Sequence, residues 1–392
     1  MRVIGLISGT SFDAIEVAAA DFELEGDILR CTLLGAESRP YAPPLRDRIA
    51  AALPPAATTL AGTCELDTLI GQAFAEAAAA ADQSLCHGRA ELVCSHGQTV
   101  YHWVSEGRAL GTLQLGQAAW IAERTGLPVV SNVRARDLTV GGQGAPLVSI
   151  LDTLLLAETD GTAGAAALNL GGIANLTAVR PGQPPIAYDT GPANALIDAA
   201  VREVTGGAEH YDDGGRRAAR GQVDRRLLDR LLDEPYYRQA PPKTTGKELF
   251  HLPYLRARTR GFALAADDLV ATVTALTVET VARELRQLGV EEVYVSGGGS
   301  RNATLMGWLE VSLPAVRLRS SADLGVPEAS KEALAFALIG FLTAVGLPST
   351  VPSCTGGSRP VVLGSLTPGR SPMRLPEPAA TAPRRLRLEG PR

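Results

Sequence analysis

Three glycine-rich turns, each at the end of an apolar stretch, are the features of this sequence best suited to chemistry. They lie at 8–13, 171–172 and 297–299. Glycine lets the main chain approach a ligand closely, and the amides of such turns can donate to phosphate oxygens. In the first turn, the carboxylate of Asp13 can hold Mg²⁺ or a substrate hydroxyl. A plain surface hairpin with a polar tip is the alternative for that turn.

The other two turns have informative neighbours. The turn at 297–299 precedes a helix expected from about Asn302, and its backbone without side chains can let an adenine lie against it. Asp189 stands at the end of a predicted strand, before a helix predicted at Pro192–Glu203. In that position it is either a cap of the helix or a general base that faces a ligand.

Several familiar sites are missing from the sequence. The one Gly-Lys pair, Gly246-Lys247, is followed by Glu248, which excludes a P-loop. Gly-x-Gly-x-x-Gly, Gly-x-Ser-x-Gly and His-Glu-x-x-His do not occur, which argues against a dinucleotide site, a hydrolase elbow and a zinc protease. His96 and His102 form too weak a pattern for a metal pair. The stretch 212–214, Asp-Asp-Gly, is predicted to be a polar turn.

The composition describes an ordinary globular protein. At 392 residues the chain exceeds what one core usually holds, so we expect two domains. A net charge of −5 argues against a nucleic-acid partner. The sequence has neither an apolar run of membrane-spanning length nor an export signal at its start. The five cysteines form no Cys-x-x-Cys pair, which fits reduced thiols in the cytoplasm.

The order of elements predicts an α/β fold built from two similar halves. Each half opens with a glycine-tipped hairpin and continues into alternating helices and strands, which favours mixed sheets flanked by helices, with a cleft between the halves. Predicted strands are 3–7, 15–20, 28–34, 91–95, 111–115, 128–131, 165–170, 173–179, a short one ending at 189, and 292–296; predicted helices are 43–53, 64–82, 116–125, 192–203, 223–232, 265–288 and 327–345. The expected domains are 1–160, joined by 347–366, and 161–346, with a flexible tail at 367–392.

Taken together, these motifs resemble the anhydro-N-acetylmuramic acid kinases, a family of the hexokinase–actin superfamily. The likeness extends from about Val3 to about Gly364, and many motifs occur in the same order. They are Ser8-Gly-Thr-Ser11 with Asp13, Ser95-His-Gly-Gln-Thr99, Thr112-Leu-Gln-Leu-Gly116, Gly141-Gly-Gln-Gly-Ala-Pro-Leu147, Leu168-Asn-Leu-Gly-Gly-Ile-Ala-Asn175, Asp189-Thr-Gly-Pro192, Pro241-Pro-Lys-Thr-Thr-Gly246, Ser296-Gly-Gly-Gly-Ser-Arg-Asn302 and Lys331-Glu-Ala333.

The resemblance implies two ribonuclease H-like domains with an interdomain cleft, use of ATP and Mg²⁺, and a homodimer. The family phosphorylates 1,6-anhydro-N-acetylmuramic acid while water opens the anhydro bridge, a step of peptidoglycan recycling. By position, Asp189 is the base that activates the water, and Thr99, Arg134 and Glu332 match the sugar site. The residues implied to bind ATP are Gly9, Thr10, Ser11, Phe12, Asp13, Ala14, Ile15, Glu16, Gly171, Gly172, Gly297, Gly298, Gly299 and Asn302, with Asp13 as a metal ligand. Taken singly, Arg134 and Glu332 are ordinary surface charges.

Three positions depart from the family pattern. Ala14 and Ala193 stand where the family has glycine, and Glu16 stands where it has aspartate. Alanine disfavours a positive φ, so we expect an altered phosphate loop and allow a shifted substrate preference. Two rival functions follow: a kinase of a related amino sugar, and a non-catalytic, ATP-gated sugar sensor. The segment 241–246 is either a loop near the cleft mouth or a plain connector.

Overall fold

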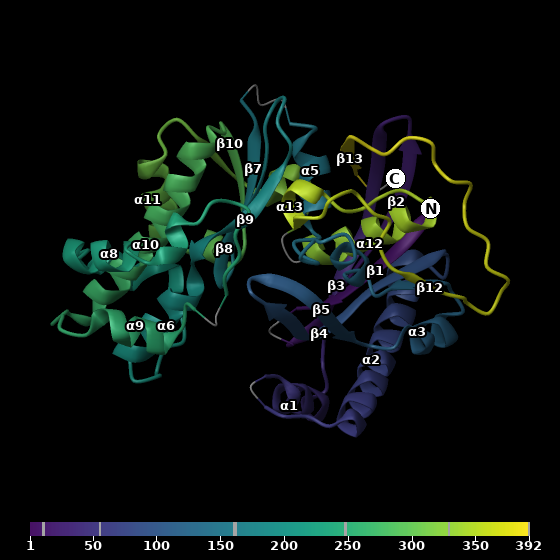
Figure 1. The fold of residues 1–392 in the computed structure, drawn as a ribbon, viewed down its shortest axis with the longest axis horizontal. Coiled ribbons are helices and arrows are strands. Elements are labelled where there is room, and N and C mark those ends of the chain that lie inside the picture. The colour runs from purple at the N-terminus through teal and green to yellow at the C-terminus, as the bar shows by residue number, and fades with distance from the viewer. Residues whose placement is uncertain (10–11, 55, 160–162, 247–248, 328–329, 391–392) are drawn as a thin grey trace. The chain divides into compact units, whose positions relative to one another are not determined.

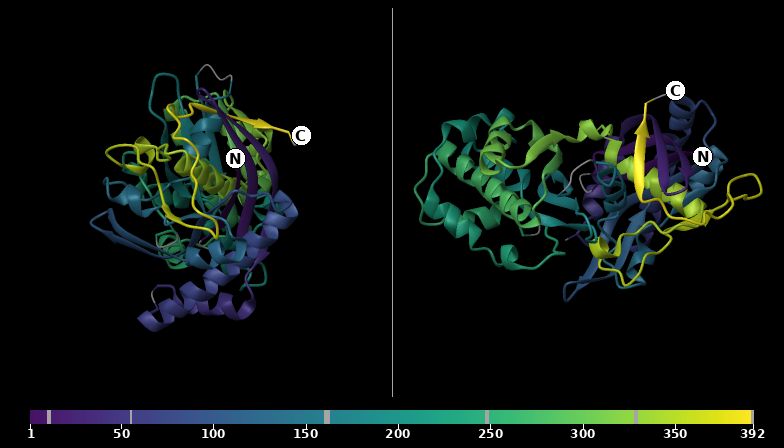
Figure 2. Two further views of the ribbon diagram at one scale, coloured as in Figure 1. Left: turned by 90° about the vertical axis from the view of Figure 1, so that its right-hand side faces the viewer. Right: turned by 90° about the horizontal axis from the view of Figure 1, so that it is seen from above.

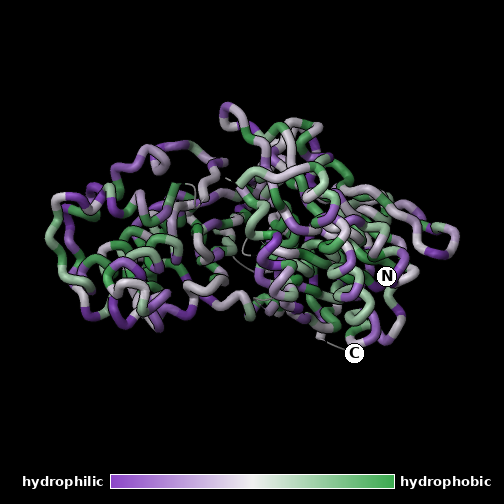
Figure 3. Tube along the Cα trace, turned by 90° about the horizontal axis from the view of Figure 1, so that it is seen from below, coloured by the Kyte–Doolittle hydropathy of each residue, from purple (hydrophilic) through white to green (hydrophobic). Residues whose placement is uncertain are grey.

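The chain consists of two compact units. The computed structural model describes residues 1–9, 12–54, 56–159, 163–246, 249–327 and 330–390 (Figure 1). One unit comprises Met1–Glu158 with Ala329–Arg392, and the other comprises Thr159–Glu328. Each unit has its own sheet and its own buried core, and apolar segments gather in the interior of each (Figure 3). In the described part of the chain, no helix has the length and apolar character needed to cross a membrane.

The sheet of the first unit is mixed. Its strands are β1 (Arg2–Ser8), β2 (Ala14–Glu25), β3 (Ile28–Pro40), β4 (Leu92–Ser105), β5 (Arg108–Leu115), β6 (Val129–Ser131), β12 (Ser365–Thr367) and β13 (Arg385–Glu389). They follow the order β12-β6-β4-β1-β2-β3-β13, and β5 pairs with β4 off this path. β1, β4 and β6 are parallel, whereas β2 is antiparallel to β1 and β3.

The first predicted hairpin is confirmed. β1 and β2 pair from Arg2 opposite Asp21 to Ser8 opposite Ile15, so the predicted tip lies between the strands. β4 is longer than the predicted strand 91–95, because it continues through residues 96–105. This extension carries the His96–Thr99 motif into the sheet, where each side chain has a fixed orientation.

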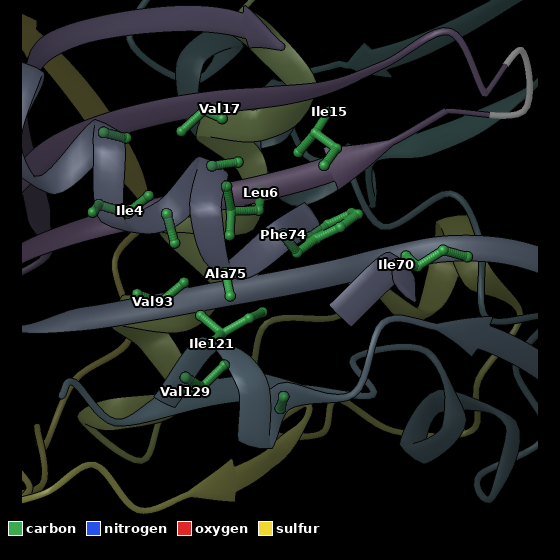
Figure 4. Close-up of a cluster of buried hydrophobic side chains, with 14 of the residues drawn as sticks. Ile4, Leu6, Ile15, Val17, Ile70, Phe74, Ala75, Val93, Ile121 and Val129 are labelled. Atoms are coloured by element: carbon green, nitrogen blue, oxygen red, sulfur yellow. The ribbon is translucent and has the colours of Figure 1, made fainter. Parts of the chain in front are cut away.

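Helices cover both faces of this sheet. The unit also contains α1 (Pro43–Ala52), α2 (Leu60–Cys86), α3 (Ala118–Thr125), α4 (Ala135–Leu138), α5 (Ser149–Leu156), α12 (Lys331–Ala344) and α13 (Pro352–Thr355). Ile70 and Phe74 of α2 pack against Ile4 and Leu6 of β1 in one buried cluster (Figure 4). α12 lies close to β1, since a Cβ atom on Gly5 would stand 2.0 Å from the carbonyl oxygen of Ala333.

The structure corrects two of the expected boundaries. We expected α12 in the second domain, but its apolar surface is buried on the first sheet, where Phe341 stacks on Phe22 with ring centroids 5.3 Å apart. We expected a flexible tail, but its residues 385–389 form β13, which pairs in parallel with β3 (Figure 2). Leu386 of β13 is buried. The tail is rich in proline and arginine, and this composition gave no sign of a buried apolar residue.

The second unit repeats the arrangement of the first. Its strands are β7 (Ala165–Leu170), β8 (Ile173–Val179), β9 (Ile186–Pro192), β10 (Glu292–Ser296) and β11 (Arg317–Ser320). Across the sheet they lie in the order β9-β8-β7-β10-β11, and β8 is antiparallel to its neighbours β9 and β7. β3-β2-β1-β4-β6 of the first unit has the same order and directions. The predicted fold class, two ribonuclease H-like α/β units with mixed sheets, is confirmed.

The helices of the second unit lie around α10. They are α6 (Asn194–Val204), α7 (Arg216–Arg220), α8 (Arg225–Leu232), α9 (Leu252–Thr259), α10 (Ala266–Leu288) and α11 (Ala303–Ser312). α10 ends at Gly289, whose φ of 67° permits the left-handed cap. α6 begins two residues later than predicted, because β9 continues past Asp189 to Pro192. β11 was not predicted, since its alternation of arginine with leucine and serine resembles a surface loop.

Candidate functional site

Asp189 is held by the segment that follows Pro242. Its backbone N–H donates to the carbonyl of Lys243 at 3.0 Å. Its carboxylate oxygen Oδ2 accepts from the hydroxyl of Thr244 and from the backbone N–H of Thr245, each at 2.9 Å. α6 has no side-chain cap, so the role of helix cap is wrong for Asp189. The side chain is partly exposed and its orientation is fixed, as a general base requires.

Gly171 and Gly172 hold the start of α6. The carbonyl of Gly171 accepts from the backbone N–H and the side-chain amide of Asn194, at 3.0 and 2.9 Å. The carbonyl of Gly172 accepts from the backbone N–H groups of Ala193 and Ala195, each at 3.0 Å. Ala193 has a φ of −122° and a ψ of −114°, so the positive φ that would disfavour alanine does not occur, but this pair of angles lies outside the usual helical and extended regions.

Gly297 and Gly299 pack against the end of β7. Gly297 has a φ of 86°, and a Cβ there would stand 2.5 Å from the Asn169 side-chain oxygen. A Cβ on Gly299 would stand 2.7 Å from that of Leu170. Gly298 is different, because its Cβ would meet only ordinary contacts at 3.8 Å. The middle glycine of the turn therefore borders open space.

That space is a pocket of about 550 Å³ within the second unit. It is lined by Asn194, Ile197, Asp198, Tyr211, Asp212, Asp213, Gly214, Gly298, Arg301 and Asn302. Asp212 is committed to the start of α7, since its carboxylate accepts from the N–H groups of Arg217 and Ala218 at 2.8 and 3.0 Å. Where a polar turn was predicted at 212–214, the structure has a short 3-10 helix, Asp213–Gly215, that leads into α7. Two other groups that line the pocket, the exposed ring of Tyr211 and the guanidinium of Arg301, are suited to contact the flat ring of a nucleotide base.

The tip of the first hairpin is described in part. Thr10 and Ser11 lie outside the described residues. The carbonyl of Gly9 accepts from the backbone N–H of Phe12 at 3.0 Å, and Phe12 has a φ of 44°. A Cβ on Gly9 would meet nothing within 4 Å, so this glycine also borders open space.

The acidic residues of this hairpin have partners. The exposed Asp13 forms an ion pair with Arg46 at 2.5 Å. Glu16 accepts from the hydroxyl of Ser38 at 2.8 Å. Ala14 and Ile15 belong to β2, where Ala14 lies opposite Pro40 in extended conformation. The positive φ that would disfavour alanine at position 14 does not occur, which removes that ground for expecting an altered loop.

Arg134 lies beside His96 in the first unit. Its Nε donates to Nε2 of His96 at 2.7 Å, and its Nη1 donates to the carbonyl of Gly144 at 2.6 Å. Nδ1 of His96 lies 2.9 Å from the carbonyl of Gly97. These contacts are satisfied together by a neutral His96 that carries its proton on Nδ1. Burial, together with the positive charge of Arg134, lowers the pKa of His96 well below 6.5.

The positive charge of the Arg134 guanidinium is only weakly balanced by negative charge nearby. Burial lowers its pKa to about 10, and the charge of Glu332 opposes that shift. No ion pair joins Arg134 to a carboxylate among the residues the structure describes. Glu332, at the start of α12, is solvent-exposed, yet the protein surrounds its carboxyl group enough to raise the pKa. Arg134 is therefore suited to pair with a carboxylate of a ligand.

Thr99 belongs to the same unit as Arg134. Its hydroxyl oxygen accepts from the side-chain amide of Gln114 at 3.1 Å, and that amide also donates to Thr112 at 2.7 Å. Gln98 next to it binds the carbonyls of Gly9 and Thr99, at 3.2 and 3.1 Å. Gln98 thus links the hairpin tip to the strand that carries Thr99.

The comparisons with known proteins agree with the motifs. The sequence model described as anhydro-N-acetylmuramic acid kinase matches residues 1–369. Similar proteins of that name come from Streptomyces coelicolor (59% identical, all of both chains covered), Rhodococcus erythropolis (55%, 99% of this chain and 100% of the relative) and a Cyanothece species (41%, 93% and 99%). The chain belongs to the anhydro-N-acetylmuramic acid kinase family. It is accordingly a kinase that uses ATP and acts on a small sugar.

Several functional candidates of this family member were missed in the sequence. Thr244 and Thr245 lie in a motif whose role stayed open, and their distance along the chain from Asp189 hides the contact. His96 was considered only as a metal ligand. Tyr211 lies in an irregular segment far in sequence from the predicted glycine turns, whereas Arg301 ends a short 3-10 helix, Gly298–Arg301, which adjoins one of them.

The residues fit Mg²⁺ only in a limited way. Kinases commonly hold this ion through one or two carboxylates, with phosphates and water supplying the other ligands. Asp13 is an exposed carboxylate of that kind, though it is paired with Arg46. Among the described residues, no group of three or more potential ligands gathers to form a metal centre by itself.

Proposed function

We propose that this enzyme phosphorylates 1,6-anhydro-N-acetylmuramic acid with ATP while water opens the anhydro bridge. The products are N-acetylmuramic acid 6-phosphate and ADP. The observation that carries the proposal is the carboxylate of Asp189, partly exposed and oriented by Thr244 and Thr245. A carboxylate fixed in this way can accept a proton either from a sugar hydroxyl or from water. A fixed carboxylate that activates water fits the coupled reaction.

The sugar contacts the first unit in this proposal. Arg134 pairs with the lactyl carboxylate, which distinguishes muramic acid derivatives from other amino sugars. The weakly compensated charge of Arg134 supports this role, since a ligand carboxylate would form charge-assisted hydrogen bonds there. Thr99 and Glu332 bind hydroxyl groups of the sugar, as their match to the family's positions implies.

The nucleotide lies against the glycine turns. The pocket beside Gly298 takes the adenosine, with Tyr211 and Arg301 in contact with the base. Gly9 and the rest of the 9–16 stretch, with Gly171 and Gly172, lie at the phosphates. The carbonyls of Gly171 and Gly172 accept hydrogen bonds from the start of α6. In this proposal these bonds fix the backbone that contacts the phosphates.

The chemical steps balance with one base. Asp189 takes a proton from water, the water oxygen bonds to the anomeric carbon, and the bond from that carbon to oxygen six breaks. Oxygen six then bonds to the γ-phosphorus as the bond to ADP breaks. Mg²⁺ bound to the phosphates, with Asp13 as its protein ligand, would offset negative charge during transfer. The protein's main contribution is to position the reactants and exclude competing water.

We further propose the cellular setting that the resemblance implies. The enzyme works in the cytoplasm, as a homodimer, in peptidoglycan recycling and amino-sugar catabolism, without nucleic-acid or membrane partners. Light scattering of the purified protein tests the dimer, and a monomer at micromolar concentration would contradict it.

Substitution of the base tests the catalytic assignment. Asp189→Asn keeps an acceptor for Thr244 and Thr245 but cannot take a proton. We expect turnover to fall by about 10²- to 10⁴-fold, the usual contribution of a general base, with the Kd for ATP unchanged. Near-normal turnover would contradict the role of Asp189. A panel of anhydro and reducing amino sugars separates this function from a related sugar kinase, and the ATP-gated sensor predicts no phosphorylated product from any of them.

A further inference from the structure

The segment 241–246, whose role the sequence left open, is fixed to the longest helix of the second unit by a buried ion pair. Nζ of Lys243 lies 3.0 Å from Oε1 of Glu284, and the two side chains are 2% and 4% exposed. Glu284 belongs to α10, and its other oxygen accepts from the hydroxyl of Tyr188 at 3.1 Å. The residues on either side of Lys243 are exposed, so Lys243 is the buried attachment point of this part of the segment.

Two tyrosines enclose the ammonium group of Lys243. The nitrogen lies 5.3 Å from the ring centroid of Tyr236 and 5.9 Å from that of Tyr188, within the range of cation–π attraction. Tyr236 also donates its hydroxyl to the main-chain carbonyl of Asp189 at 2.6 Å. Tyr188 precedes Asp189 in β9. The aromatic groups that surround the ion pair thus contact the residue proposed as the base or adjoin it in sequence.

Asp189 is therefore held by groups that themselves depend on Lys243. The carbonyl of Lys243 accepts from the N–H of Asp189, and Thr244 and Thr245 donate to its carboxylate. A shift of the main chain at residue 243 would move each of these contacts at once. We propose that the Lys243–Glu284 ion pair positions the carboxylate of Asp189 by fixing the segment 241–246 to α10. The inference rests on the proposed role of Asp189 as the base.

A purely stabilising role is the competing explanation. The cost of removing both charges from water offsets much of their attraction, so a buried ion pair contributes little net stability compared with apolar residues of similar volume. What it does contribute is a defined geometry, because Lys243 and Glu284 must meet at hydrogen-bond distance. The more exposed guanidinium of Arg283 also lies 3.5 Å from Oε1 of Glu284, which adds a second cation beside the ion pair.

The test uses the full chain with substitutions that keep the shape of the pair. Glu284→Gln retains an acceptor for Lys243 and a group that can bond Tyr188, but it removes the charge. Lys243→Met keeps the length of the side chain and removes the ammonium group. The matched control is Glu292→Gln in β10, another buried glutamate, which accepts from Tyr294 at 3.1 Å and pairs with Arg317 at 3.0 Å.

Two readouts separate positioning from stability. We expect Glu284→Gln and Lys243→Met to lower kcat by about 10- to 100-fold, the effect of a displacement of about 1 Å in an active site, while KM for ATP stays unchanged. Hydrogen exchange of the peptide that covers 241–246 should become faster, because the Thr245 amide loses its fixed acceptor. Glu292→Gln should lower stability without either effect.

Each outcome decides the question. Unchanged exchange at 241–246 in Glu284→Gln, or an equal loss of kcat in Glu292→Gln, would overturn the positioning role. If Lys243→Met does not fold, Glu284→Gln alone carries the test, since it preserves size and hydrogen bonding. If the wild-type protein phosphorylates no sugar, the proposed function fails, while the exchange measurement still shows whether the ion pair fixes the segment.

Discussion

The hydroxyl of Thr244 donates to the carboxylate of Asp189 at 2.9 Å, although the two residues are 55 positions apart in the sequence. The backbone amide of Thr245 donates to the same oxygen. Two donors on one oxygen leave the direction of the carboxylate well defined. This arrangement makes a lone Asp-Thr-Gly sequence a candidate for general base catalysis.

Removal of the Thr244 hydroxyl should reduce turnover. Thr244→Val keeps the shape of the side chain and deletes the hydrogen bond, whose loss to a charged partner corresponds to about 1.5–3 kcal/mol, or about 10- to 100-fold in kcat. Thr244→Ser restores the hydroxyl and is the control. Steady-state kinetics of both variants test this role. Equal activity of Thr244→Val and Thr244→Ser would show that the Thr244 hydroxyl does not support Asp189.

Arg134 should decide whether the lactyl group is recognised. Arg134→Gln is expected to raise KM for 1,6-anhydro-N-acetylmuramic acid by about 10- to 100-fold, because the ligand carboxylate loses its charged partner. The same change should leave any turnover of 1,6-anhydro-N-acetylglucosamine, which lacks that carboxylate, nearly unaltered. Parallel kinetics on the two sugars measure this difference. An equal loss on both would indicate damage to the fold around His96.

Two neighbouring glycines should respond in opposite ways to alanine. Gly298→Ala adds a methyl group that meets only ordinary contacts at 3.8 Å, so we expect an unchanged Tm but a Kd for ATP raised about tenfold, because the methyl group occupies the pocket. Gly297→Ala places a side chain at a φ of 86° against Asn169, so we expect a lower Tm. Calorimetry of both variants tests the pair. Tight ATP binding by Gly298→Ala would place the adenosine elsewhere.

His96 should make the protein sensitive to acid. Its pKa in the folded state lies well below 6.5, the ordinary value, because of burial and the charge of Arg134. Below pH 6.5 the unfolded chain binds a proton that folded His96 does not. The stability from this group is therefore complete above that pH and is lost as the pH falls further, by up to about 1.4 kcal/mol per pH unit.

His96→Gln is the variant that isolates this effect. Glutamine can accept from Arg134 and donate to Gly97 as the neutral histidine does, but it does not titrate. The free energy of unfolding of the variant should decline less than that of the wild type between neutral pH and about pH 5.5. Identical declines in denaturant titrations would show that His96 does not control the acid response.

The sequence was sufficient to predict features that depend on local pattern. The hairpin at 165–179 was predicted because two apolar runs flank Gly171-Gly172, and the duplicated order of elements followed from its likeness to the first hairpin. Asp189 was proposed as a base because it ends a predicted strand, and that role stays a prediction. These features need only neighbours in the chain.

Features that depend on distant partners were not predicted. The arginines of β13 alternate with leucines, but the strand forms only because β3 offers an edge to it. α12 is apolar almost all round, so its sequence could not say which sheet it covers. The contact of Thr244 with Asp189 likewise has no periodic signal, since an irregular segment brings the two together.

The most direct test of the proposed reaction is made in heavy-oxygen water. The purified protein is given ATP, Mg²⁺ and 1,6-anhydro-N-acetylmuramic acid, and the product is analysed by mass spectrometry. We predict a sugar 6-phosphate that carries the heavy oxygen in its anomeric hydroxyl, because Asp189 activates solvent water at that carbon. An unlabelled phosphosugar with an intact anhydro bridge would contradict the coupled reaction and indicate a simple kinase.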